Sequence, residues 1–234
     1  LDISNDGEEG SILNFLSKIG MDYIFYETFE LGELPQGWYD TTNAVDCDYP
    51  GWFISEDASS SYFEIPAGDG LYIATNDDEC GGSSDGSNDM LYTNGISLPE
   101  GLIELSFRRF FTSGFGQTFH VLITTDSWDN STEILNLGGW DGSEEWVKET
   151  INLNNYAGES VEIAFHSNDN GNWASGVALD DIQLEVTPLW IFSSSTGTIQ
   201  YQGVETFEFS ISTEGLGLSL IHISEPTRQA EMAY

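Results

Sequence analysis

Short runs of alternating or β-rich residues recur along the chain, whereas the periodicity of long helices is nearly absent. The runs are DYIFYETFE, GWFIS, GLYIAT, LIELSFRRFF, TFHVLITT, EILNL, EWVKETINL, SVEIAFHS and GVALDDIQLEV. Glycine, asparagine, aspartate and serine cluster between them, as in SNDNGNW and GGWDGSEE, and such clusters are typical of turns. About ten short strands of this kind predict an all-β fold, an antiparallel jelly-roll β-sandwich.

Two of these runs also indicate how their strands are buried. In SVEIAFH, the apolar residues Val161, Ile163 and Phe165 share one face, so the opposite face should be more solvated. In LIELSFRRFF, apolar and polar residues occur on both faces. This mixture favours a central strand that is buried on both sides near its middle.

Changes in composition divide the chain into four segments. Residues 21–187 contain the main series of strands, while 1–20 and 188–217 carry a few strands each and are too small to bury a core alone. The stretch LSLIHISEPTR, within residues 218–234, resembles a translated sequencing adapter, so we expect this tail to be non-native. The first residue is not Met, and we therefore expect the chain to be part of a longer protein.

The composition supports a packed core and excludes some partners. Hydrophobic residues make up 39% of the chain, but 40 acidic residues face only 5 basic ones, for a net charge of −35. With so few basic residues, the chain lacks the basic patch that binding to nucleic acid or an anionic membrane requires. No apolar run reaches the roughly 18 residues needed to insert in a membrane. A solvated acidic surface, typical of a salt-adapted protein, and local cation sites are both compatible with this excess.

Cys47 and Cys80 are the only cysteines, and each lies in a polar, Asp-rich loop. Their spacing does not match a metal-binding pair. One disulfide in an exported protein is the favoured interpretation, with two free thiols as the alternative.

The stretch TNDDECGGSSDGSNDM, Thr75 to Met90, concentrates acidic residues without a basic one. Two like charges about 4 Å apart repel by roughly 4 kcal/mol at an effective dielectric constant of about 20. Such a loop must either stay spread out in water or hold a cation.

Several motifs occur in the order found in one known family. They are ETFELGELPQGW, GLYIATNDDEC with SNDMLYTNGISLPEG, EEWVKETINLNNYAGESVEIAFHS and GVALDDIQLEV. Residues 21–187 therefore resemble the choice-of-anchor J or cleaved-adhesin domains, which are relatives of the MAM-type jelly rolls of exported bacterial proteins. One motif departs from the family pattern, because TTDSWDNST places its aromatic residue early, at Trp128. The flanks resemble parts of bacterial immunoglobulin-like repeats, one ending before the jelly roll and one truncated after it.

The resemblance implies a structural calcium site that joins the first strand, the acidic loop and the closing strand. Calcium prefers six to eight oxygen ligands. Transferred to this sequence, the ligands would be Glu27, Asn76, Asp77, Asp78, Asp89, Asp180 and Asp181. Because Asp180 and Asp181 are adjacent in an expected strand, their side chains should point to opposite faces, and at most one should face the ion.

The sequence offers little for catalysis. No GxSxG, HExxH, Walker or GxGxxG motif occurs in a usable context. We expect His120 and His166 to be strand residues with satisfied hydrogen bonds. Trp128, Trp140 and Trp173 lie in loops rich in glycine, asparagine and aspartate, where they either form a stacking platform for a ligand or anchor the loops to the sandwich rim.

These observations lead to one functional expectation with two alternatives. The resemblance implies a non-catalytic, calcium-stabilised binding or adhesion module that works outside the cell or on the bacterial surface, with an extracellular protein or glycan as ligand. The alternatives are a carbohydrate-binding module accessory to a hydrolase or protease domain, and a purely structural spacer.

Overall fold

The structure is a computed structural model of the 234-residue chain. It describes residues 2–4, 12–16, 22–44, 47, 49–68, 70–80, 87–187, 190–192, 196–200, 204–206 and 209–211. The expected adapter-derived tail, 218–234, lies outside these residues. In the described part of the chain, no helix has the length and apolar character needed to cross a membrane.

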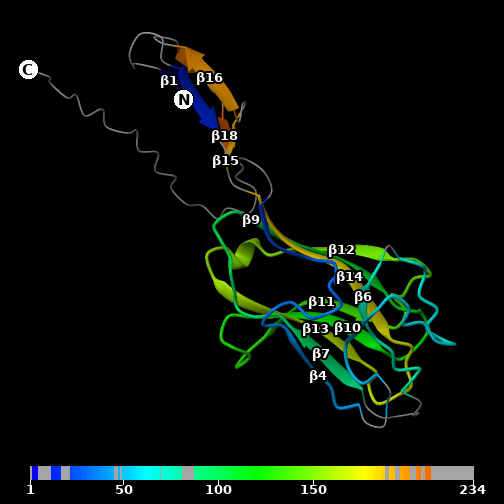
Figure 1. Ribbon diagram of the computed structural model, residues 1–234. Coiled ribbons are helices and arrows are strands. Elements are labelled where there is room, and N and C mark those ends of the chain that lie inside the picture. Colours follow the sequence, from blue (N-terminus) through cyan, green and yellow to red (C-terminus); the bar gives the residue numbers. More distant parts are fainter. Residues whose placement is uncertain are drawn as a thin grey trace, which may run out of the picture.

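Two antiparallel sheets form a β-sandwich (Figure 1). Sheet 1 has the strand order β11-β10-β13-β7-β4, and β8 also pairs with β13. Its strands are β4 (Tyr39–Thr41), β7 (Asn88–Tyr92), β8 (Ile96–Ser97), β10 (Thr118–Thr124), β11 (Thr132–Gly138) and β13 (Ser160–Asn168).

Sheet 2 has the strand order β12-β9-β14-β6-β5, and β3 also pairs with β14. Its strands are β3 (Asp22–Glu27), β5 (Phe53–Ser55), β6 (Tyr72–Thr75), β9 (Leu102–Phe110), β12 (Val147–Asn152) and β14 (Val177–Thr187). A short 3₁₀ helix, η1 (Asn154–Tyr156), follows β12. Each of the nine runs identified in the sequence overlaps one of these strands, so the all-β prediction is confirmed.

The burial of individual strands also follows the sequence pattern. β9 lies between β12 and β14, and Leu105, Ser106 and Phe107 are at most 2% exposed, which confirms a central strand buried on both sides. In β13, Val161, Ile163 and Phe165 face the core. Ala164 on the opposite face is buried as well, because neighbouring side chains cover it.

The main core fills the space between the two sheets. Phe107 of sheet 2 makes edge-to-face contacts with Phe165 and Phe119 of sheet 1, with ring centroids 5.4 and 6.1 Å apart. A smaller core lies on the outer side of sheet 2, where Phe63 and Ala58 pack against Phe110 and Ala178. The connection between β5 and β6 therefore covers part of the outer face of sheet 2.

The segments before and after the sandwich pair with each other. β1 (Asp2–Ser4) pairs with β17 (Val204–Thr206), and β2 (Ile12–Leu16) pairs with β16 (Thr196–Gln200). β15 (Trp190–Phe192) pairs with β18 (Phe209–Ile211). The sequence indicated strands in both flanks, but not that the two flanks share ladders.

Candidate functional site

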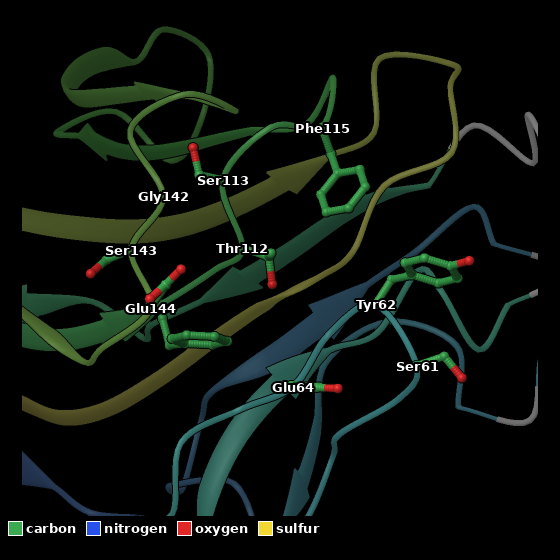
Figure 2. A pocket seen from close by; sticks show the side chains of 10 residues that line it. Ser61, Tyr62, Glu64, Thr112, Ser113, Phe115, Gly142, Ser143 and Glu144 are labelled. Atoms are coloured by element: carbon green, nitrogen blue, oxygen red, sulfur yellow. The ribbon is translucent and has the colours of Figure 1, made fainter.

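A cleft with a volume of about 590 Å³ lies at one end of the sandwich (Figure 2). It is built from the β5–β6 connection, the end of β9 with the loop that follows, and the β11–β12 connection. Its lining residues are Ser61, Tyr62, Glu64, Phe110, Thr112, Ser113, Phe115, Gly142, Ser143 and Glu144. In Figure 2, the Tyr62 and Phe115 rings lie on one side, and Ser143 and Glu144 lie on the other.

Trp173 holds two of the aromatic rings that line the cleft in place. Its ring makes edge-to-face contacts with Phe115 and Tyr62, at centroid distances of 4.7 and 5.2 Å. Aromatic pairs of this kind contribute about 0.5–1.5 kcal/mol beyond the area that they bury. Trp173 is half-buried, so it anchors the rim and supports the aromatic wall of the cleft at the same time.

Trp140 lies in the loop beside the cleft, and its side chain is 83% exposed. The Ser113 hydroxyl donates a hydrogen bond to the Trp140 carbonyl oxygen at 3.4 Å, which ties this loop to the cleft wall. The Trp140 ring is therefore barely packed against the protein. A tryptophan that anchors a loop would instead be largely buried.

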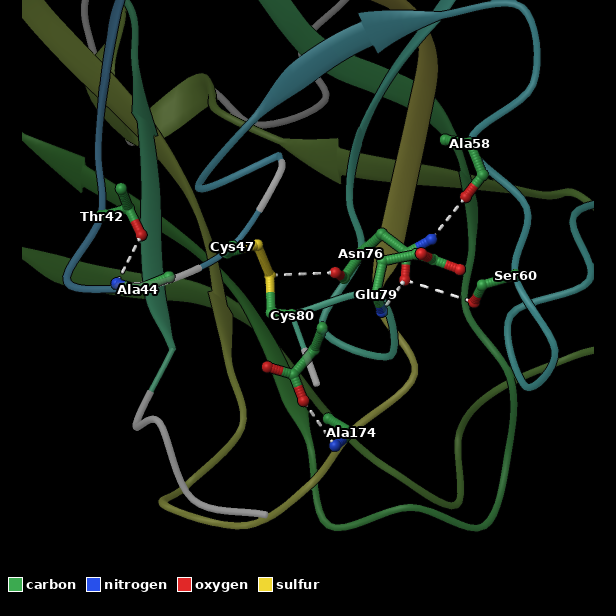
Figure 3. Close-up of a disulfide and its surroundings, with 10 residues drawn as sticks. Thr42, Ala44, Cys47, Ala58, Ser60, Asn76, Glu79, Cys80 and Ala174 are labelled. Carbon is green, nitrogen blue, oxygen red and sulfur yellow. Dashed lines mark hydrogen bonds between the residues drawn. A yellow bond between two sulfur atoms is a disulfide. The ribbon is translucent and has the colours of Figure 1, made fainter. Parts of the chain in front are cut away.

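Asn76 and Asp78, after β6, position the loop that carries Tyr62, and Figure 3 shows Asn76 beside Ala58 and Ser60 of that loop. Asp78 Oδ2 accepts hydrogen bonds from the Ser60 hydroxyl at 2.6 Å and from the Tyr62 backbone N–H at 3.0 Å. The Asn76 side-chain amide donates to the Ala58 carbonyl oxygen at 2.7 Å. Part of the acidic loop therefore shapes the aromatic cleft.

Asp77 and Cys80 connect the same loop to two other segments. Asp77 is only 6% exposed, and its Oδ2 accepts the Ala174 backbone N–H at 2.6 Å. Cys80 forms a disulfide with Cys47, with the two Cα atoms 4.5 Å apart. Backbone N–H groups stabilise a buried carboxylate without a cation. Asp77 and Asp78 are thus integrated in the fold rather than spread out in water.

Asp89 lies at the same end of the molecule but in sheet 1. It is buried in β7, where it pairs with Ser167 of β13. The Thr75 hydroxyl at the end of β6 donates a hydrogen bond to the Ser167 hydroxyl at 3.2 Å, so Asp89 lies near the residues that follow β6.

Asp180 and Asp181 lie together on β14, and Glu27 of β3 is paired with the next residue, Ile182. The register of β14 shifts between Asp180 and Gln183, and Asp181 has a φ of 51°. Both carboxylates therefore approach the same Arg108 Nη1, at 4.0 Å for Asp180 Oδ2 and 3.5 Å for Asp181 Oδ2. The expectation that the two side chains point to opposite faces is wrong, because the bulge breaks the strand alternation.

Burial raises the pKa of Asp180 to about 6, and the nearby carboxylates of Asp181 and Glu30 act in the same direction. The hydrogen bond from the Asp181 N–H and the charge of Arg108 oppose this rise. Asp180 is thus a crowded, buried carboxylate whose ionised form a cation would stabilise.

The two acidic groups are separated along β6. Thr75 at the end of β6 pairs with Val177, so Asn76 and Asp77 follow that end of the strand, whereas Asp180 lies three residues further along β14. Among the described residues, no three histidine, cysteine, aspartate or glutamate side chains are grouped in a way that would hold a metal ion. The oxygen chemistry suits calcium, and the ligand set that the family resemblance implies stays a prediction.

Trp128 lies away from the cleft. It follows β10, whereas Phe115 precedes this strand, and a seven-residue strand separates its two ends by about 23 Å. The Trp128 ring contacts Tyr92 edge-to-face at 5.1 Å on sheet 1. Trp140 and Trp173 are therefore adjacent to the cleft, and Trp128 belongs to another surface.

His120 and His166 have hydrogen-bond partners, as expected from their positions in strands. His120 Nδ1 donates to Glu133 Oε2 at 2.7 Å, and His166 Nε2 donates to Asn88 Oδ1. The sequence did not identify Tyr62 and Phe115 as site residues. The signal available for Phe115 was a lone aromatic residue between glycines in TSGFGQ.

The two antiparallel sheets form a jelly-roll β-sandwich, and a cleaved adhesin domain shares this fold. Among similar solved structures is the K3 cleaved adhesin domain of Lys-gingipain from Porphyromonas gingivalis W83, with 18% identity, a TM-score of 0.50, and coverage of 71% of this chain and 99% of that domain. This likeness shows the fold alone.

Two carbohydrate-binding modules are also similar. One is TmCBM61, solved with β-1,4-galactotriose, with 17% identity, a TM-score of 0.46, and coverage of 67% of this chain and 92% of the module. The other is the CBM22-1 xylan-binding domain of Paenibacillus barcinonensis Xyn10C, with 15% identity, a TM-score of 0.44, and coverage of 74% and 99%. No family model and no curated protein matches the chain.

Proposed function

We propose that this chain is a non-catalytic binding or adhesion module of a larger exported bacterial protein, which contacts an extracellular protein or glycan through the aromatic cleft. The observation that carries this proposal is the cleft itself, where Tyr62 and Phe115 stand opposite the polar side chains of Ser143 and Glu144. Ligand sites typically combine an apolar or aromatic wall with a few polar groups that fix orientation.

Rings and hydroxyls in this arrangement also support the alternative of a carbohydrate-binding module. The exposed ring of Trp140 extends the cleft with a surface on which the apolar face of a sugar can stack. A purely structural spacer would have no need for an exposed tryptophan beside an aromatic cleft.

Binding can be tested with a glycan array and with immobilised extracellular-matrix proteins. We expect Trp140→Ala to weaken binding to the retained ligand at least tenfold while leaving the melting temperature unchanged, because its side chain has few protein contacts. Tyr23→Ala, at an exposed position on β3, is the matched control and should bind normally. If no glycan or protein is retained, or if both variants bind like the parent, the proposed function is wrong.

We also propose that calcium stabilises the module, with the neighbouring carboxylates of Asp180 and Asp181 among its ligands. Arg108 already supplies one positive charge there, so the ion would have to displace or supplement it. The support is the crowded carboxylate of Asp180, with its raised pKa and its neighbours Asp181 and Glu30.

Calcium stabilisation is tested by thermal melting in EGTA, followed by addition of calcium or magnesium. Binding to the folded state contributes about 2.7 kcal/mol at a hundredfold excess over Kd, which corresponds to a rise of about 5–10 °C in Tm. We expect Asp180→Asn to remove this rise and Asp77→Asn to retain it, although Asp77→Asn should lower the baseline Tm. A melting temperature that is insensitive to calcium would exclude the ion.

A further inference from the structure

The outward face of sheet 1 carries a band of aromatic and polar side chains that the cleft does not use. We call His120, His166, Glu133, Tyr92, Tyr39 and Trp128 the outer-face band. The strands that carry the band are neighbours in sheet 1. Within each strand, the residue next to a band residue faces the core, as Phe119 does beside His120 and Phe165 beside His166. All six side chains are exposed or half-buried.

The register of sheet 1 brings the band together from segments far apart in the sequence. His120 lies directly opposite His166 across β10 and β13. Tyr92 of β7 lies opposite Tyr39 of β4, and also opposite Ala164, two residues before His166 in β13. At about 4.8 Å per strand, five strands span about 19 Å, which is room for several linked sugar rings.

One end of the band is an aromatic platform. The rings of Tyr39 and Tyr92 stack at 4.7 Å with an interplanar angle of 16°, and the Trp128 ring meets Tyr92 edge-to-face. Tyr39 is 47% exposed, so the platform is not closed off by the protein. Tyrosine and tryptophan present an apolar ring with a polar tip, which matches the apolar and hydroxyl-bearing faces of a sugar.

The backbone places Trp128 on this platform at an energetic cost. Trp128 has a φ of 73°, a left-handed conformation that is uncommon for a bulky residue and costs of order 1–3 kcal/mol. The Thr124 hydroxyl oxygen accepts the Trp128 N–H at 3.3 Å, and the Asp126 carboxylate in turn accepts the Thr124 hydroxyl at 2.8 Å. The turn thus holds a strained tryptophan against Tyr92.

The other end of the band offers hydrogen-bonding groups. The rings of His120 and His166 stack with centroids 5.4 Å apart, and each donates one ring N–H, to Glu133 and Asn88 respectively. In a neutral imidazole the remaining nitrogen is an acceptor. Two imidazole acceptors and the Glu133 carboxylate therefore suit a ligand rich in hydroxyl donors.

The negative charge of the protein discriminates between charged and uncharged polymers as ligands of the band. Glu133 lies in the band, Glu162 projects from the same face, and the chain carries a net charge of −35. This field repels nucleic acids and acidic polysaccharides. From the aromatic platform, the hydroxyl acceptors and the negative field, we propose that the outer-face band is a second binding site, for an extended, uncharged polysaccharide chain.

The histidines provide a direct test, because the chain has only three: His120, His166 and His222. The full chain is titrated with cellohexaose, xylohexaose and β-1,4-galactotriose, with oligogalacturonate as the acidic probe, while the histidine ring protons are followed by NMR. We expect at least one uncharged probe to shift the His120 and His166 signals, leave the His222 signal in place, and saturate. Oligogalacturonate should shift neither band histidine.

Three variants locate the binding. Tyr39→Ala and Trp128→Ala should each raise the Kd at least tenfold, and Tyr39→Ala serves if the Trp128 variant fails to fold. Phe115→Ala, in the cleft, should leave this Kd unchanged. The second-site proposal and the proposed function of the cleft can therefore fail independently of each other. The proposal is overturned if no uncharged probe moves the band histidines, or if the shifts survive in the folded Tyr39→Ala variant.

Discussion

His166 shows how one residue's surroundings set its chemistry. It is half-buried on β13, stacked against His120, which is paired with Glu133. Burial lowers the pKa of His166 to about 4, and the positive charge that His120 can carry lowers it further, while Glu133 acts in the opposite direction. His166 is therefore neutral at pH 5–7.

This lowered pKa predicts a loss of stability in acid. An unfolded histidine has a pKa of about 6.5, so between about pH 6.5 and pH 4 the unfolded state binds more protons than the folded state. The free energy of unfolding should therefore fall as the pH decreases through this range, with no contribution from His166 above it. Ring-proton NMR titration checks the pKa, and urea unfolding at pH 7 and pH 5 checks the slope. His166→Gln should weaken the pH dependence, and an NMR pKa near 6.5 would contradict the prediction.

Residue-level expectations succeeded where they depended on hydrogen-bonding capacity and failed where they depended on ideal strand geometry. Both histidines were expected to be satisfied strand residues, and both are. That they stack on each other depends on the pairing of β10 with β13, which no local pattern encodes. Similarly, the bulge at Asp181 is a single left-handed residue without a glycine to mark it.

At the scale of elements, alternation predicted the strands well and their partners hardly at all. The long strands β9, β10, β13 and β14 coincide with four of the runs. The three-residue strand β4 was not identified, because a sequence as short as YDT has no recognisable period. The cleft could not be predicted because Tyr62, Phe115 and Glu144 meet only through three separate loops.

The ends of β6 and β14 approach so closely that only glycine fits at position 176. Gly176 has a φ of 141°, and an added Cβ would lie 2.4 Å from the Thr75 carbonyl oxygen and 2.9 Å from the Phe63 ring. We expect Gly176→Ala to lower the free energy of unfolding by about 2–3 kcal/mol, measured by urea denaturation. Gly95→Ala is the control, since nothing lies within 4 Å of its added Cβ and the change should stay within about 0.5 kcal/mol. Equal stability of the two variants would mean that the approach is looser than described.

At the scale of the whole molecule, the residues after β6 and the disulfide both stabilise the end of the sandwich that carries the cleft. Cys47 and Cys80 close a loop with a sequence separation of 33, and the residues after β6 brace the wall of the cleft. The length of this loop gives an entropic stabilisation of about 3.7 kcal/mol in the chain-entropy model.

We therefore expect the double variant Cys47→Ser/Cys80→Ser to lose about 2–4 kcal/mol of stability in urea unfolding. Reduction of the parent protein with dithiothreitol should produce a similar loss, and the double variant should not respond to the reductant. Free-thiol quantification by mass spectrometry provides an independent check. A parent protein whose unfolding is the same with and without reductant would argue against a stabilising disulfide.

The pairing of the two flanks has a mechanical consequence. The sandwich begins with β3 and ends with β14, and these strands are antiparallel neighbours, with Asp22 opposite Val186. A pull on the two ends of the described chain would first load the β1–β17 and β2–β16 ladders, which precede and follow the sandwich in the sequence. Tension would reach the jelly roll only after these ladders part, and it would then peel β3 from β14 starting at one end. The sandwich thus lies outside the direct path of the force, so it can stay folded while the flanking ladders carry the load.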